Sequence, residues 1–169
     1  MEAIPSSKPG SIYLFQEFNP SMIYSTTDKV VLGFLGRALS LEMTAVQQHL
    51  TVSRLLKLRG FDEISEKFQH EAHEEMGHAD RIIGRMLMLG VAPNATQLRP
   101  AQLGDSLPEV MAAVHALETE LVGFYQRAVE HCAVNDDFDN KLFFEQLLQE
   151  ERAHVHEFAN WQQMLKPST

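Results

Sequence analysis

Cysteine is almost absent from this 169-residue sequence, which contains only Cys132 and therefore cannot form an intramolecular disulfide. A protein without disulfides fits a reducing compartment, and we expect this one to be cytoplasmic. The sequence also lacks a basic segment followed by an apolar stretch and a small-residue cleavage site, so no secretion signal is predicted. Its uncharged apolar runs fall well short of the roughly 20 residues that a membrane-spanning helix needs. We therefore expect no membrane partner.

Basic residues are also scarce, because 14 Lys and Arg stand against 23 Asp and Glu and give a formal charge of −9. A nucleic-acid-binding protein needs a cationic face for the phosphates, so no nucleic-acid partner is expected. An acidic protein suits cations instead. The length fits one domain with a substantial core rather than two domains.

Residues 1–27 differ in composition from the rest of the chain. Pro5, Pro9 and Pro20 interrupt them, and serines and threonines add turn-forming side chains. This segment predicts an extended N-terminal arm. From Asp28 onward the apolar residues recur with helical spacing, so residues 28–166 are predicted to form a single helical domain.

Four helical segments are predicted in this domain, each bounded by residues that favour helix ends. Gly60 and Gly90 are expected to stop the first two segments. Ser106, Pro108 and Glu109 form the pattern of a capping box with proline just inside the helix, which marks the start of the third. The predicted segments are about 28–59, 62–89, 107–134 and 138–165.

The connections between these segments determine how the helices are joined. A helix of nearly thirty residues is about 40 Å long. The first and third connections are only a few residues, but the middle one, residues 91–105, spans about 50 Å when extended. It is therefore long enough to run the whole length of the bundle. We predict an all-α, ferritin-like four-helix bundle with one long crossover.

Six ionisable side chains fall on the apolar faces of these helices, where a core is expected. Burying an unpaired carboxylate costs on the order of several kcal/mol, and four together would also repel one another. Two divalent cations carry the charge that balances four glutamates. Oxygen-rich ligation with one imidazole for each metal suits iron or manganese better than structural zinc. The six residues, predicted as metal ligands and as catalytic residues, are Glu42, Glu75, His78, Glu118, Glu151 and His154.

The spacing of these residues repeats between the two halves of the domain. An isolated Glu-x-x-His pair is more often a solvated helix face. Here, however, 33 residues separate Glu42 from Glu75, and the same 33 separate Glu118 from Glu151. A histidine follows the second glutamate by three positions in both halves. The neighbouring Glu120 breaks this register, so Glu118 is the predicted ligand.

Three segments of the sequence resemble the bacterioferritins. They are Glu75-Met-Gly-His-Ala-Asp-Arg81, Met88-Leu-Gly-Val-Ala-Pro-Asn94 and Glu150-Glu-Arg-Ala-His154. The resemblance covers about residues 28–165 and implies a ferroxidase with two Fe per chain, held by the ligand set known for ferritin-like carboxylate proteins. It implies that Glu75 and Glu151 bridge the two irons. Glu42 with His78, and Glu118 with His154, would complete the two coordination spheres.

The same resemblance implies substrates, assembly and further binding residues. Bacterioferritins oxidise Fe(II) with O2 or H2O2 and deposit the ferric product inside a shell of 24 subunits, for storage or detoxification. Met76 occupies the position of the methionine that ligates haem b between two subunits, so a homo-oligomer of at least a dimer is expected. His70 and Glu74 fall where the family has inner-surface residues that help to pass iron to the core.

Some positions depart from the family pattern. Position 49 is histidine where bacterioferritins have a tyrosine beside the di-iron site, and Tyr125 takes the equivalent place in the second half. Both are predicted to contact the ligands and tune the redox chemistry. For His49, direct ligation and a plain core histidine are the alternatives.

The length of the chain beyond the last predicted ligand is a further departure. Only fifteen residues follow His154, fewer than the family's short fifth helix requires. The alternative function is therefore a non-storage di-iron oxidase or oxygenase that acts as a dimer on peroxide or a small substrate. A third interpretation is a structural bundle that uses metal or haem only for stability or electron transfer.

Overall fold

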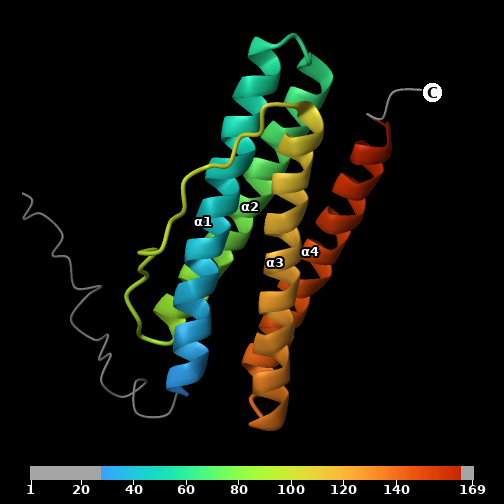
Figure 1. The fold of residues 1–169 in the computed structure, drawn as a ribbon. Coiled ribbons are helices and arrows are strands. Elements are labelled where there is room, and N and C mark those ends of the chain that lie inside the picture. The colour runs from blue at the N-terminus through green and yellow to red at the C-terminus, as the bar shows by residue number, and fades with distance from the viewer. Residues whose placement is uncertain (1–27, 165–169) are drawn as a thin grey trace, which may run out of the picture.

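The computed structural model describes residues 28–164, and within this range the chain forms four α-helices without any strand (Figure 1). The predicted segments are confirmed to within one or two residues at every described end. The arm predicted for residues 1–27 lies outside the described residues, as does the last part of the predicted domain. The helices are α1 (Lys29–Leu58), α2 (Asp62–Met88), α3 (Leu107–Val134) and α4 (Phe138–Met164).

The four helices form two antiparallel hairpins, α1 with α2 and α3 with α4 (Figure 1). The segment between α2 and α3 runs along α1 from one end of the bundle to the other, which confirms the predicted long crossover. Gln48 of α1 fixes this segment by pairing with the backbone of Gln102, at 2.8 Å as donor and 2.7 Å as acceptor. Arg99 of the crossover binds Glu120 of α3 at 2.7 Å.

The predicted stops at Gly60 and Gly90 are confirmed, because both glycines adopt a positive φ of 82° and 74°. After α1, the amide of Gly60 donates to the carbonyl of Lys57 and that of Phe61 to Leu56, which closes a Schellman motif. The chain ends α2 in the same way. The tight turn at Gly60 allows α2 to fold back against α1, and the turn at Gly90 directs the chain into the crossover.

The start of α3 is confirmed at Ser106, whose side chain accepts from the amide of Glu109 at 3.4 Å. The second half of the predicted capping box is wrong, because Glu109 Oε2 accepts from the amide of Asp105 rather than from Ser106, at 2.8 Å. The backbone of Gly104 passes so close to Glu109 that a Cβ there would lie 2.2 Å from the Glu109 Cβ. This close approach places the Asp105 amide over the carboxylate.

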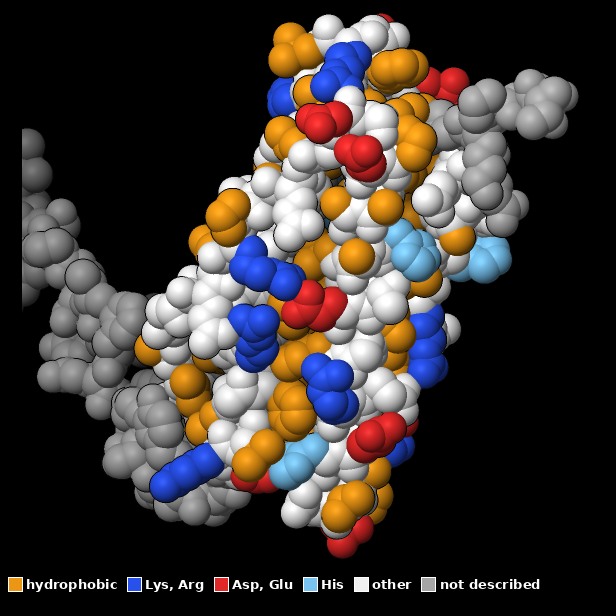
Figure 2. Space-filling view, viewed as in Figure 1, with side chains coloured by type: hydrophobic (Ala, Val, Ile, Leu, Met, Phe, Trp, Pro, Cys, Tyr) orange, Lys and Arg blue, Asp and Glu red, His pale blue; other side chains and the backbone are white. Residues whose placement is uncertain are grey.

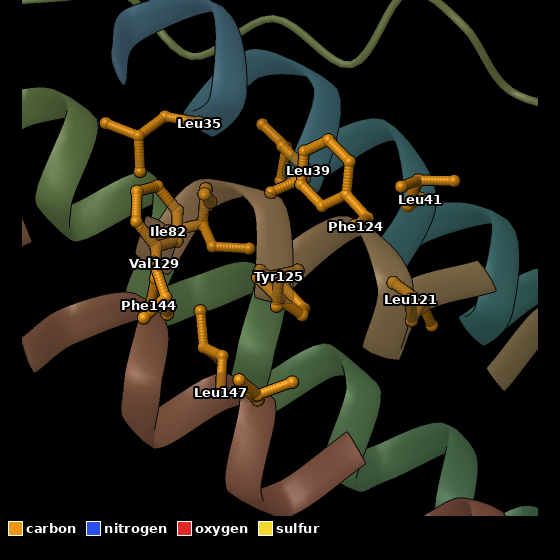
Figure 3. Packing of buried hydrophobic residues seen from close by; sticks show 14 of the residues in the cluster. Leu35, Leu39, Leu41, Ile82, Leu121, Phe124, Tyr125, Val129, Phe144 and Leu147 are labelled. Carbon is orange, nitrogen blue, oxygen red and sulfur yellow. The ribbon is translucent and has the colours of Figure 1, made fainter. Parts of the chain in front are cut away.

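The apolar core forms two clusters at different heights in the bundle. Figure 3 shows the larger cluster, where Leu35 and Leu39 of α1 pack with Ile82 of α2, Tyr125 of α3 and Phe144 of α4. The smaller cluster also draws on all four helices: Val52, Leu56, Phe68, Val110, Met111, Val114, Phe158 and Trp161. On every helix the six predicted ligands fall between or beside the residues of these clusters, so a polar layer interrupts the core.

The helix α1 is the one described helix that is long and apolar enough to cross a membrane by length and hydropathy alone. Its most apolar window is 56% buried inside the bundle, as expected for a core helix. On the face formed by α1, α3 and the crossover, basic and acidic side chains are interspersed (Figure 2). Among these side chains, Glu120 forms ion pairs with Arg37 and Arg99.

Candidate metal centre

The six predicted ligands lie together in the polar layer of the bundle. All four glutamates are completely buried, and His78 and His154 are only 5% and 7% exposed. Two overlapping groups bring one donor atom from each member within 4.8 Å of the others. The first group is Glu42, Glu75, His78 and Glu151, and the second is Glu75, Glu118, Glu151 and His154.

The first group surrounds the Nδ1 atom of His78. This nitrogen lies 2.7 Å from Glu151 Oε1, 3.1 Å from Glu75 Oε2 and 3.5 Å from Glu42 Oε2. Three carboxylates from three helices therefore converge on one imidazole nitrogen. The i,i+3 spacing of Glu75 and His78 places both side chains on the same face of α2.

The second group surrounds the Nδ1 atom of His154 in the same manner. This nitrogen lies 3.1 Å from Glu75 Oε1, 3.6 Å from Glu151 Oε2 and 3.9 Å from Glu118 Oε2. The rings of His78 and His154 stack at 5.5 Å with an interplanar angle of 12°. The two halves of the centre thus lie side by side.

Glu75 and Glu151 are shared between the two groups. Glu75 turns Oε2 toward His78 and Oε1 toward His154. Glu151 turns Oε1 toward His78 and Oε2 toward His154. Each shared carboxylate therefore presents one oxygen to each half, which is the arrangement that a carboxylate bridging two cations requires.

Most donor atoms of this layer have no hydrogen-bond partner, although buried polar groups in proteins are nearly always paired. The unpaired atoms are Glu42 Oε2, both carboxylate oxygens of Glu75, Glu118 and Glu151, and Nδ1 of His78 and His154. Such a set of unpaired oxygen and imidazole donors fits two divalent cations. The residues present therefore match the predicted di-metal site in donor type and in placement.

Burial and mutual repulsion perturb the carboxyl groups of the layer. Burial, followed by the charges of Glu151 and Glu75, raises the pKa of Glu42 well above its ordinary value. Burial and the same two charges raise the pKa of Glu118. Burial also opposes the charged form of Glu75, but the close contacts with His154 and His78 outweigh it and hold the pKa of Glu75 well below its usual range.

The two histidines respond in the opposite direction to the glutamates. Burial disfavours their charged forms, but contacts with Glu151, Glu42 and Glu75 outweigh it and raise the pKa of His78. Glu151 and Glu75 likewise raise the pKa of His154 to about 11. Without metal, the raised pKa values therefore favour protons on the two imidazoles and on the carboxyl groups of Glu42 and Glu118. Cations that bind here must displace those protons.

The outer nitrogen of His78 is held by a residue that the sequence reasoning missed. Glu150 Oε2 lies 3.0 Å from His78 Nε2, and Arg81 forms an ion pair with the same carboxylate. Burial raises the pKa of Glu150, but the bond from Arg81 outweighs it and lowers the pKa overall. This carboxylate fixes the imidazole with Nδ1 toward the layer. The sequence carried no local signal for this contact, because Glu150 lies on α4 whereas His78 and Arg81 lie on α2.

Tyr125 and His49 each contact one of the two glutamates that are not shared between the groups, Glu42 and Glu118. The hydroxyl of Tyr125 on α3 donates to Oε1 of Glu42 on α1. His49 on α1 places Nε2 2.9 Å from Oε1 of Glu118 on α3. Burial lowers the pKa of His49 and raises that of Tyr125. Both side chains are therefore in contact with a predicted ligand.

The remaining predicted residues lie at the margin of the layer or outside it. His70 and Glu74 are exposed and 3.7 Å apart, and Glu74 Oε2 reaches to 3.6 Å from His154 Nε2. Met76 is 51% exposed on α2. Glu120, the rejected alternative to Glu118, is partly exposed and pairs with arginines.

The sequence reasoning also missed Glu71, which is almost fully buried one helical turn before Glu75. Burial raises the pKa of Glu71 to about 7. Its Oε2 lies 3.8 Å from His154 Nε2 and has no hydrogen-bond partner. Its position at i−4 from Glu75, on the inner face of α2, was the signal available in the sequence.

Comparisons with known proteins identify the family to which this chain belongs. The model of the ferritin-like domain matches residues 33–166. The chain is 37% identical to a bacterioferritin of Rhodobacter capsulatus, over 76% of this chain and 80% of that protein. It is 33% identical to a bacterioferritin of Brucella melitensis, over 74% of this chain and 78% of that one.

A solved structure shows the same arrangement. It is a Rhodobacter capsulatus bacterioferritin with a metal-free dinuclear site and a haem iron in a crystallographic special position. It superposes with a TM-score of 0.78 at 34% identity, covering 82% of this chain and 86% of that chain. Sequence, fold and buried ligand pattern agree, and the chain belongs to the bacterioferritins of the ferritin-like family.

Proposed function

We propose that this chain is a ferroxidase that binds two irons in its buried layer and oxidises Fe(II) with O2 or H2O2, for iron storage or detoxification. The observation that carries the proposal is the set of unpaired carboxylate and imidazole donors, arranged in two overlapping groups. Membership of the bacterioferritin family supports it. Bound iron supplies the one-electron redox chemistry, which no side chain of the layer provides by itself.

In this proposal the residues of the layer have distinct roles. Glu75 and Glu151 would hold both metals, since each presents one oxygen to each half. Glu42 with His78, and Glu118 with His154, would complete the two positions. Tyr125 orients Glu42 through its hydroxyl, and Glu150 orients His78. Complete burial of the four glutamates excludes bulk water from the reacting ions.

Replacing a bridging carboxylate tests the proposal. We expect Glu75→Ala and Glu151→Ala each to lower the initial rate of Fe(II) oxidation in air by at least about a hundredfold, because both metals lose a ligand. Far-ultraviolet circular dichroism should show that helix content is retained. Glu120→Ala is the matched control, since this glutamate lies outside the layer on the same helix as Glu118. Wild-type rates in both bridging variants would refute the assignment.

The assembly decides between storage and the alternative function. Light scattering recorded during Fe(II) addition measures the solution mass and the growth of ferric mineral together. A mass near that of the family's 24-subunit shell, with continued mineral growth, supports storage. A dimer that oxidises about two irons per chain and then stops supports the non-storage di-iron oxidase instead. Family membership and the lone cysteine support a cytoplasmic location.

We also propose that Met76 ligates haem b at a contact between two copies of this chain. The thioether side chain is 51% exposed on α2, so it is accessible to a partner helix. The related Rhodobacter capsulatus protein contains haem iron in a crystallographic special position. Reconstitution with haem should give the absorption spectrum of a low-spin haem with two thioether ligands in the wild type. We expect Met76→Leu to lose that spectrum.

A further inference from the structure

His49 is a buried histidine that is not among the six proposed ligands of the ferroxidase. Its side chain is completely buried on α1, at the level of the polar layer. The ring stacks on Phe158 at 5.4 Å, and Phe68 lies 5.9 Å away. These aromatic rings hold the imidazole in place, so that its Nε2 atom is directed toward α2 and α3.

The distances around Nε2 are those expected between ligands of one metal. Two ligands at right angles, each about 2.1 Å from a metal, lie about 3.0 Å apart, and two opposite ligands about 4.2 Å apart. His49 Nε2 lies 2.9 Å from Glu118 Oε1 and 3.8 Å from Glu75 Oε1. His154 Nδ1 lies 3.1 Å from the same Glu75 oxygen. All these distances fall between or near the two values.

His49 Nε2 also shares a property with the two predicted histidine ligands. It has no hydrogen-bond partner, despite the 2.9 Å distance to Glu118, so its N–H direction does not point at that oxygen. The Nδ1 atoms of His78 and His154 are likewise unpaired, at 2.7 Å and 3.1 Å from their nearest carboxylate oxygens. All three nitrogens thus lie within 3.1 Å of a carboxylate oxygen without forming a hydrogen bond to it.

The equivalent residue in the other half behaves differently. Tyr125 stands seven positions after Glu118, as His49 stands seven after Glu42. The Tyr125 hydroxyl is hydrogen-bonded to Glu42 and therefore orients a ligand. The nitrogen of His49 has no such bond. The two halves of the layer thus differ at one symmetric pair of positions.

We propose that His49 Nε2 is a third imidazole ligand, bound to the metal that Glu118 and His154 hold. The inference rests on the proposed two-metal site and extends it. The position beside His154 then has two nitrogen donors, whereas the position beside His78 has one. Nitrogen donors favour Co(II) and Fe(II) over the harder Mg(II) and Ca(II). The position with two imidazoles is therefore filled first, and the two metals load in order.

Cobalt(II) tests this directly, because it binds oxygen and imidazole ligands and does not oxidise in air in such sites. Anomalous scattering from wild-type crystals soaked in Co(II) should give two peaks, one about 2.1 Å from His49 Nε2. Two peaks with every metal beyond about 3 Å from His49 would overturn the inference while leaving the two-metal site intact. The absence of any peak in the layer would overturn the two-metal site itself.

Calorimetry with variants gives a second, independent readout. Wild-type protein should bind Co(II) in two steps of different affinity. In His49→Phe, which fills the same aromatic stack, the tighter step should weaken by at least about tenfold. His156→Phe places the same substitution on the exposed side of α4 and serves as control. An unchanged tighter step in a folded His49→Phe protein, with its melting temperature near that of the wild type, would contradict ligation.

Discussion

At the scale of single residues, the metal centre depends on side chains that hold the ligands as much as on the ligands themselves. His78 turns its Nδ1 atom toward the carboxylates while its Nε2 atom is held from outside. Glu150 provides that contact and is itself held by Arg81 of α2. The same pair also links α4 to α2 beside the centre. A mutation on the half-exposed surface is thus expected to alter metal binding inside.

The first prediction concerns this outer contact of His78. We expect Glu150→Gln to weaken Co(II) binding by about tenfold to a hundredfold, because the neutral amide orients the imidazole less strongly and no longer increases its basicity. Calorimetry on metal-free protein measures the affinity. Glu145→Gln is the control, because Glu145 lies on the same helix and, among the described residues, forms its ion pair with Lys141, at 2.7 Å. Equal affinities in the two variants would show that Glu150 has no such role.

The clustering of the six predicted ligands could be inferred from sequence, because these residues repeat at a fixed spacing on amphipathic helices. The helix period then places them on the inner faces. Glu150 could not be recognised in the same way, because its role depends on Arg81, which is 69 positions away in the sequence. The orientation of His49 depends on Phe68 and Phe158 from two other helices. Such contacts appear only after the helices have packed.

At the scale of elements, the ends of the helices determine how the two hairpins close. The glycine stops were readable from sequence, because a positive φ at a helix end favours glycine. The hydrogen bond from the Asp105 amide to Glu109 could not be read from sequence, because it follows from the close approach of Gly104 to Glu109 in the folded crossover. The turn after α3 is different. There Asp136 adopts a positive φ of 53°, whereas glycine occupies the corresponding position after α1 (Gly60) and after α2 (Gly90).

The second prediction concerns this turn between α3 and α4. An L-residue in the left-handed region is strained relative to glycine, so we expect Asp136→Gly to raise the free energy of unfolding by up to about 1 kcal/mol. Asp139→Gly, three positions later in the first turn of α4, should lower it by roughly 0.5–1 kcal/mol. Guanidinium denaturation of the metal-free protein measures both changes. A destabilised Asp136→Gly protein would mean that its side chain matters more than its backbone conformation.

At the scale of the whole molecule, the proposed metal centre joins the two hairpins. The hairpin of α1 and α2 supplies Glu42, Glu75 and His78, and the hairpin of α3 and α4 supplies the other three proposed ligands. Each metal position draws on both hairpins, so neither hairpin alone holds a complete site. Metal that binds only the packed bundle must therefore stabilise the packing of one hairpin against the other.

Metal binding must also change the protonation of the bundle, and this gives the last prediction. The pKa values of Glu42, Glu118, His78 and His154 are all raised, so without metal these four groups keep their protons to a higher pH than free side chains do. Ligation requires their deprotonated forms, and binding two cations should release protons from them. A group with a raised pKa opposes binding more as the pH falls, so Co(II) affinity should increase as the pH rises.

Calorimetry in buffers of different ionisation enthalpy measures this release. In Glu42→Gln one of the four groups can no longer carry a proton, so the number released should fall by about one relative to the wild type. In Glu120→Gln, outside the layer, it should stay at the wild-type value. A wild-type release close to zero would mean that the layer holds its carboxylates charged without metal. The charge of the buried glutamates would then have to be balanced in some way other than by protons on the four groups.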